Sequence, residues 1–338
     1  MASAGPAEFD IDFASCFQPP LQPVEVLRGV DFGTFRHRFR DPGVPVILEG
    51  ETDDWPAMAR WPDLAYLRRV AGEQPVYVRD LDRGSINGRK YSEPYQSFSF
   101  ADFLERISGS QPQNLYLTQG VIRRPTGILR AFERELHPAL LTVLAEDLPV
   151  PRFWQPDQLL AANLWLGPGS HASALHFDEF DNLNAVIAGS KRWLLFPAAQ
   201  AGKLTAGARD AQGTIVRGFH AGEPRRFEPA VRCTAHGYQC VTRPGQLLYV
   251  PRGMWHQVFS GPGLSIAVNF WFFSFARDAA KVALNSAHRY VGFRSRKRLA
   301  VALATIYLDA ARRLARYGIQ QLMRLPPPEP AVGPTSYR

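Results

Sequence analysis

Residues 173–196 read SALHFDEFDNLNAVIAGSKRWLLF and join a histidine–aspartate pair to two apolar runs typical of strands. His176 and Asp178 are two residues apart, so on a β-strand both side chains point to the same face. His256 follows eighty positions after His176, behind a Pro-Arg-Gly turn and within another strand-like run. Two imidazoles and one carboxylate can occupy one face of an octahedral Fe(II) ion and leave three positions open. The sequence therefore predicts a metal site whose third ligand comes from a different strand.

A lysine in the same stretch favours this interpretation over chance. A lone H-x-D triplet arises easily and is more often a surface feature than a metal site. Lys191, however, lies fifteen residues after His176, at the start of the apolar run that ends at Phe196. Burying an ammonium group is costly unless it meets an anion. We therefore expect an anionic ligand near the metal.

The regions on either side predict a mainly β fold with flanking helices. Residues 161–274 form a run of strand-like segments with Gly and Pro turns, which favours a double-stranded β-helix (jelly-roll or cupin) barrel. Within it, residues 198–243 are expected to be a long loop at the mouth that receives substrate. Upstream, strands are expected at residues 45–49, 75–79 and 114–119, a helix capped by Ser99 at 100–107, and one or two helices interrupted by Pro138 at 128–148.

Taken together, these motifs resemble the JmjC (cupin-like) iron(II)/2-oxoglutarate oxygenases over about residues 25–275. Besides residues 173–196, the resemblance rests on PGQLLYVPRGMWH at 244–256 and IAVNFW at 266–271. PVILEG at 45–50 and DWPA at 54–57 are similar to the entry segment of that family. The most similar subgroup is that of the small hydroxylases related to the asparaginyl hydroxylase that inhibits hypoxia-inducible factor.

The resemblance implies a role for each candidate site residue. His176, Asp178 and His256 match the iron ligands, and Lys191 matches the partner of the distal carboxylate of 2-oxoglutarate. The remaining cofactor-binding candidates are Tyr116 and Ser173, which match hydroxyl groups that bind the same carboxylate, Asn182 and Asn269, which match residues lining its pocket, and Trp271, which closes the pocket wall.

Simpler roles are open for these secondary residues. Tyr116 and Trp271 are also typical of a core, and Ser173 of a turn. Asn184 departs from the subgroup, which has an aromatic residue there, so the shape of the co-substrate pocket is in question. His171 and His236 lie near glycines in expected loops and are predicted to face solvent.

The implied reaction consumes O2 and 2-oxoglutarate, releases succinate and CO2, and hydroxylates a C–H bond. A protein side chain is the expected substrate, with RNA such as tRNA or a small molecule as alternatives. By analogy, Asp178 in place of Glu favours hydroxylation over lysine demethylation. A metal-binding cupin scaffold without turnover is the alternative of another class. A zinc hydrolase would use the same three ligands but leaves Lys191 without a purpose.

Composition fits a globular enzyme of the cytoplasm that does not enter a membrane. Hydrophobic residues make up 46% and charged residues 21% of the 338 positions, which are ordinary globular values. The three cysteines are too few and too oddly spaced for a disulfide framework or a zinc knuckle. No apolar run reaches the roughly 18 residues of a spanning helix, and no secretory signal is expected.

Four segments are expected along the chain. An extended segment at residues 1–24 is predicted to lie on the surface. The catalytic domain is placed at 25–275, with an α+β part to about residue 160 and the barrel at 161–275. Basic helices are expected at 276–325 and a Pro-rich tail at 326–338.

The basic C-terminal region suggests partners. From residue 277 to residue 324 there are eleven Lys and Arg against two Asp, densest at residues 294–298, from Arg294 to Arg298. RNA phosphates are one candidate partner for this cluster, and an acidic protein partner or a simply solvated helix are the alternatives. The repeat that begins at Leu299 predicts an amphipathic helix. For this helix the family resemblance implies homodimerisation, and packing on the barrel is the other option.

Overall fold

The computed structural model describes residues 17, 19–81, 96–124, 141–155, 158–173, 175–178, 180–200 and 235–272. The strands are β1 (Gln22–Pro23), β2 (Glu25–Arg28), β3 (Val46–Glu49), β4 (Pro75–Asp80), β5 (Gln96–Ser99), β6 (Leu115–Arg123), β7 (Leu159–Pro168), β8 (His176–Phe177), β9 (Asp181–Ala188), β10 (Lys191–Phe196), β11 (Tyr238–Thr242), β12 (Gln246–Val250), β13 (Trp255–Ser260) and β14 (Leu264–Phe272). The helical elements are α1 (Phe32–Phe35), the π-helical turn η2 (Arg36–Arg40), α2 (Pro56–Arg60), α3 (Leu64–Ala71), α4 (Phe100–Ser108), and the 3₁₀ turns η5 (Thr142–Asp147) and η7 (Ala198–Gln200).

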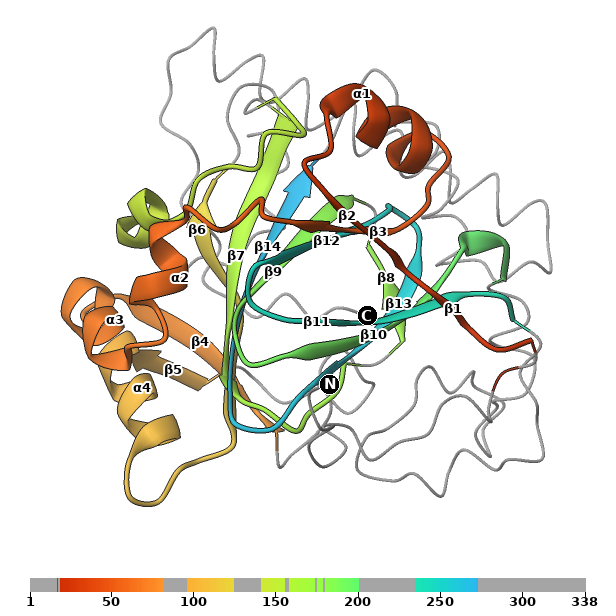
Figure 1. Ribbon diagram of the computed structural model, residues 1–338. Coiled ribbons are helices and arrows are strands. Elements are labelled where there is room, and N and C mark those ends of the chain that lie inside the picture. Colours follow the sequence, from red (N-terminus) through yellow and green to blue (C-terminus); the bar gives the residue numbers. More distant parts are fainter. Residues whose placement is uncertain are drawn as a thin grey trace, which may run out of the picture.

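Two sheets form the barrel. The larger sheet has the order β2-β3-β12-β9-β14-β7-β6-β4-β5, and the smaller one the order β1-β11-β10-β13-β8. From β7 to β14 the chain passes back and forth between them, so β7, β9, β12 and β14 face β8, β10, β11 and β13 (Figure 1). This is the double-stranded β-helix, or jelly roll, and it confirms the predicted fold class.

Strand alternation separates the polar cavity lining from the main hydrophobic core behind the larger sheet, while a smaller apolar cluster that joins β3, β10 and β12 lies inside the barrel beside the cavity. On β14, Asn269 and Trp271 line the cavity, whereas Phe270 and Phe272 belong to the main hydrophobic cluster. On β10, Lys191 lines the cavity. Because successive side chains point to opposite faces, the same strands build both the site and the core.

The main hydrophobic core lies behind the larger sheet. One cluster joins Phe35 of α1, Leu67 of α3 and Phe103 of α4 to outward-facing residues of β7, β9, β12 and β14. Figure 1 shows α2, α3 and α4 on the side of the larger sheet away from the smaller sheet. The Ser99 hydroxyl accepts a hydrogen bond from Asp102 N at 3.1 Å, which confirms the predicted cap of α4. No helix within the described residues is long and apolar enough to span a membrane.

The structure corrects two expectations about the ends of the barrel. The predicted loop at 198–243 contains β11, which pairs with both β10 and β1. The prediction that the N-terminal segment lies on the surface is wrong at Phe17, Leu21 and Val24, which are buried. Phe17 packs on Phe196 with ring centroids 5.3 Å apart, so this segment covers the outside of the smaller sheet.

Other expectations fall partly outside the described residues. Of the helical region expected at 128–148, residues 125–140 lie outside the description, and η5 occupies most of the rest. The basic helices at 276–325 and the tail at 326–338 lie outside it entirely, as does the cluster from Arg294 to Arg298.

Candidate metal centre and co-substrate cavity

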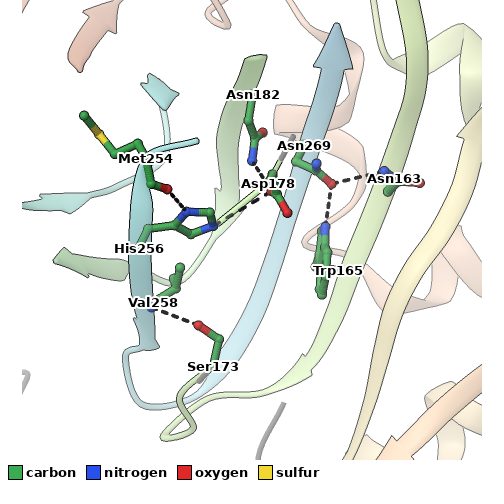
Figure 2. A network of polar contacts seen from close by, with 9 residues as sticks. All are labelled: Asn163, Trp165, Ser173, Asp178, Asn182, Met254, His256, Val258 and Asn269. Atoms are coloured by element: carbon green, nitrogen blue, oxygen red, sulfur yellow. Dashed lines mark hydrogen bonds and ion pairs between the residues drawn. The ribbon is translucent and has the colours of Figure 1, made fainter. Parts of the chain in front are cut away.

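Three side chains converge at the edge of the smaller sheet that is formed by β8. His176 on β8 and His256 on β13 are directly opposed in the antiparallel ladder, with ring centroids 4.3 Å apart. Asp178 follows β8, and its Oδ2 lies 3.9 Å from His256 Nε2 (Figure 2). One ligand atom from each residue lies within 4.8 Å of the others. The three groups can therefore hold one metal ion, with the third ligand coming from a different strand as predicted.

Hydrogen bonds orient two of these ligands. His256 Nδ1 lies 2.9 Å from the Met254 carbonyl, which can only accept, so Nδ1 carries the proton and Nε2 is left toward Asp178. Asn182 Nδ2 donates to Asp178 Oδ2 at 3.5 Å. The backbone N–H of Gly253 donates to the Asp178 carbonyl at 2.7 Å, which ties the turn before β13 to the strand end that carries Asp178.

A buried carboxylate supports that same turn. Asp181 Oδ1 accepts hydrogen bonds from the Tyr249 hydroxyl at 2.8 Å and from Arg252 N at 3.3 Å. Burial raises the pKa of Asp181, while the nearby Arg252 charge opposes that rise. Asp181 therefore holds both the end of β12 and the turn at residues 251–254, which lies shortly before His256.

Lys191 occupies a different part of the cavity with neutral partners. Its side chain is buried, and Nζ lies 3.0 Å from Ser260 Oγ and 3.4 Å from the Tyr116 hydroxyl. Burial lowers the pKa of Lys191 to about 8, and it raises the pKa of Tyr116 above its usual range, so the phenol stays protonated. A buried ammonium whose contacts within the described residues are hydroxyl groups favours binding of an anion.

All nine predicted site residues line one cavity, whose empty volume of about 610 Å³ includes space that is open to solvent. Ser173 Oγ accepts from Val258 N at 3.0 Å, and Asn269 Oδ1 accepts from Trp165 Nε1 at 2.6 Å (Figure 2). Three lining groups are buried without a hydrogen-bond partner among the described residues, namely Asn182 Oδ1, Asn184 Oδ1 and Trp271 Nε1. Such groups are costly to bury unpaired, so this wall favours a polar ligand. The individual roles implied by the resemblance stay predictions.

The structure also places residues in the cavity that the sequence did not indicate. His171, predicted to face solvent, lines the cavity, because its segment bridges to β13. His236 is exposed, as expected. Ser260 also lines the cavity and lies four residues beyond His256 on β13. Alternate residues of a strand point to the same face, so the spacing of positions 256, 258 and 260 could have identified it. Gln119 also lines it, with a φ of 54° at an irregularity in β6, and no sequence pattern indicates that.

Comparison with known proteins gives a family match over most of the chain. The family of cupin-like domains matches residues 33–278. The Jumonji C domain-containing protein 5 of Drosophila melanogaster is 30% identical over 250 residues, covering 70% of this chain and 57% of that protein. Lysine-specific demethylase 8 of Xenopus tropicalis is 27% identical, covering 70% and 50% respectively. The human bifunctional peptidase and (3S)-lysyl hydroxylase JMJD7 is 28% identical, covering 70% and 80%. The chain spans about half the length of the first two relatives.

Proposed function

Since the chain belongs to the cupin-like JmjC oxygenase family, we propose that it is an Fe(II)- and 2-oxoglutarate-dependent hydroxylase of a protein side chain. The observation that carries the proposal is the buried Lys191 ammonium, which lines the same cavity as the His176, Asp178 and His256 group. A metal site alone is compatible with many functions. Here the metal site shares its cavity with a buried ammonium group that meets hydroxyl groups and no carboxylate among the described residues. This arrangement fits a co-substrate that has an anionic end.

The donor set fits a ferrous ion. Imidazole and carboxylate groups in a two-to-one ratio on one face leave positions open for a chelating ligand and for oxygen. His256 is held with Nε2 toward the metal position by its bond to the Met254 carbonyl, and Asn182 donates to the ligating carboxylate of Asp178. When bound, Fe(II) with 2-oxoglutarate supplies the oxidation of a C–H bond, with release of succinate and CO2.

The residues around the metal position do the binding and orientation. Lys191 supplies charge for the distal carboxylate, and the protonated hydroxyl of Tyr116 lies beside it. Asn182, Asn184 and Trp271 offer unpaired polar groups along one wall. We expect that wall to orient the ligands that enter the cavity and to exclude loosely bound water from them.

Demethylation is the second candidate, because several relatives are named as lysine-specific demethylases. Both reactions begin with hydroxylation of a C–H bond. On an N-methyl group the hydroxylated carbon leaves as formaldehyde, whereas on a side-chain carbon the oxygen stays on the protein. The product therefore distinguishes hydroxylation from demethylation. The lysyl hydroxylase among the relatives supports hydroxylation as the first candidate.

The test is turnover of 2-oxoglutarate by the full-length protein with Fe(II) and ascorbate. We expect slow succinate formation without substrate, lost in His176→Ala and requiring far more 2-oxoglutarate in Lys191→Met. His236→Ala, at an exposed histidine outside the cavity, is the matched control and should behave as wild type. If the metal-loaded protein binds no 2-oxoglutarate, the proposal is wrong and a metal-binding scaffold is the remaining interpretation.

Substrate class follows from a second measurement on the active protein. Incubation with a lysate separated into protein and RNA fractions should place the added oxygen on protein, detected by mass spectrometry, while released formaldehyde would indicate demethylation. A cytoplasmic location, RNA contact through residues 294–298 and homodimerisation stay predictions from the sequence.

A further inference from the structure

His171 is held inside the cavity on the segment that connects β7 to β8. Its backbone carbonyl accepts a hydrogen bond from Ser260 N at 2.8 Å, and the next residue forms a β-bridge with Phe259. The imidazole packs on the Tyr116 ring, with centroids 4.1 Å apart. The ring is thus fixed on two sides, by the barrel backbone and by an aromatic neighbour.

Its hydrogen bonds determine which nitrogen carries the proton. His171 Nδ1 lies 2.9 Å from the Pro168 carbonyl, which can only accept, so Nδ1 donates. Burial, reinforced by the positive charge of Lys191, lowers the pKa of His171 to about 3, so the ring is neutral at physiological pH. A neutral ring with its proton on Nδ1 leaves Nε2 as an acceptor.

That acceptor sets the direction of the Ser260 hydroxyl. Ser260 Oγ lies 3.2 Å from His171 Nε2 and 3.0 Å from Lys191 Nζ. A serine hydroxyl has one hydrogen and two lone pairs. Its hydrogen goes to Nε2, because Lys191 offers only donors, and a lone pair then faces the ammonium. The bonds run in one direction, from Lys191 to Ser260, from Ser260 to His171, and from His171 to the Pro168 carbonyl.

We infer that His171 is a positioning residue that, through the Ser260 hydroxyl, aims the Lys191 ammonium at the distal carboxylate of 2-oxoglutarate. The inference rests on the proposed function, since the carboxylate belongs to its co-substrate. One ammonium hydrogen is held by Ser260 and one lies near the Tyr116 hydroxyl, which leaves the third for the ligand. A neutral acceptor in this place orients the lysine without competing for the anion and without repelling the ammonium.

Loss of the ring should weaken ligand binding rather than abolish it. Without His171, the Ser260 hydrogen is free to turn, and Lys191 loses a fixed acceptor. One hydrogen bond of this kind is worth about a fivefold change in affinity, so a rise of about fivefold in the dissociation constant for 2-oxoglutarate is expected. Metal binding should be unchanged, because the ring makes no described contact with His176, Asp178 or His256.

The experiment is calorimetric titration of anaerobic, Mn(II)-loaded full-length protein with 2-oxoglutarate. His171→Phe and Ser260→Ala should each raise the dissociation constant, and the double variant should bind no more weakly than Ser260→Ala alone. His171→Gln keeps an acceptor near the Nε2 position and should restore most of the affinity. The dissociation constant for Mn(II) alone should be the same in all of them.

Controls separate the inference from the proposed function. His236→Phe makes the same substitution at an exposed histidine and should leave both constants unchanged. Wild-type affinity in His171→Phe, or losses that multiply in the double variant, would overturn the inference while leaving the oxygenase intact. Ser260→Ala removes the same link without altering the ring, so wild-type affinity there overturns it even if His171→Phe does not fold. A wild-type protein that binds Mn(II) but not 2-oxoglutarate refutes the proposed function itself.

Discussion

Lys191 shows how burial prepares a single residue for a ligand. In water an ammonium is charged far above neutral pH, but in this cavity burial lowers the pKa of Lys191 to about 8. The neighbouring hydroxyls of Tyr116 and Ser260 supply acceptors without supplying charge. An incoming carboxylate provides the missing counter-charge, so co-substrate binding and lysine protonation are coupled.

This coupling predicts a pH dependence of co-substrate affinity. As the pH rises through about 8, Lys191 in the ligand-free protein loses its charge. The dissociation constant for 2-oxoglutarate should therefore stay nearly level at neutral pH and then rise by up to about tenfold for each further pH unit. Lys191→Arg should remove that dependence, because a guanidinium keeps its proton. Titrations of the Mn(II)-loaded protein across this range test it, and an equally steep dependence in Lys191→Arg would contradict it.

Sequence reasoning located residues whose roles depend on short spacing. His176 and Asp178 share a face because they are two residues apart. Lys191 stands at the start of an apolar run, which indicated a buried cation. The position of His171 was wrongly predicted because its half-buried place in the cavity depends on the bridge to β13, which joins segments almost ninety residues apart in the chain. The prediction that His171 faces solvent rested on the nearby glycines, which are a local feature of the sequence and carry no information about pairing with a distant strand.

At the scale of elements, the turn between β12 and β13 is the part that orients His256 within the candidate metal site. Residues 251–254 are tied to the Asp178 carbonyl through Gly253 and to the Asp181 carboxylate through Arg252. The Met254 carbonyl then accepts a hydrogen bond from His256 Nδ1. The turn thus determines the orientation of the His256 ring, although none of its own side chains belongs to the candidate metal site.

Removing the buried carboxylate should affect both stability and metal binding. Asp181→Ala leaves the Tyr249 hydroxyl and Arg252 N without their acceptor, which should lower the free energy of unfolding by about 2–4 kcal/mol. Metal affinity should fall by about tenfold or more, as is usual for groups that support a ligand. Urea denaturation and Mn(II) titration measure the two effects. Asp53→Ala, which breaks an exposed ion pair with Arg28, should cost less than about 1 kcal/mol and leave the metal site intact.

The elements themselves were predicted with uneven success. The strands at β3, β4 and β6 and the cap of α4 follow from local patterns of apolar residues and from the Ser99 side chain. β11 was missed because YQCVT is short, mostly half-buried and preceded by an apparently irregular stretch. It is a strand because β10 and β1 offer partners on either side, which a local pattern cannot express.

For the whole molecule, the cavity lining and the main hydrophobic cluster lie on opposite faces of the strands of the larger sheet. Leu183 and Asn184 are neighbours on β9, yet Leu183 belongs to the main hydrophobic cluster and Asn184 lines the cavity with an unpaired, buried Oδ1. Leu183→Ala should lower the free energy of unfolding by about 2–5 kcal/mol. Asn184→Leu should leave it unchanged or raise it by about 1 kcal/mol, because the unpaired carbonyl group is removed.

The matched pair is measured by urea denaturation of the metal-free protein, alongside titration with 2-oxoglutarate in the presence of Mn(II). Asn184→Leu is expected to weaken co-substrate binding while keeping stability, and Leu183→Ala to do the reverse. A large loss of stability in Asn184→Leu would show that the cavity wall contributes to folding.

The position of the core has a consequence for how such a protein changes over time. Because the main apolar cluster lies behind the larger sheet, between that sheet and the helices, the polar residues of the cavity lining contribute little to the stability of the fold. Substitutions in the lining are then filtered mainly by what they do to ligands and only weakly by what they do to the scaffold. A descendant of this chain can acquire a new target by exchanging lining residues one at a time, each step passing through a folded intermediate.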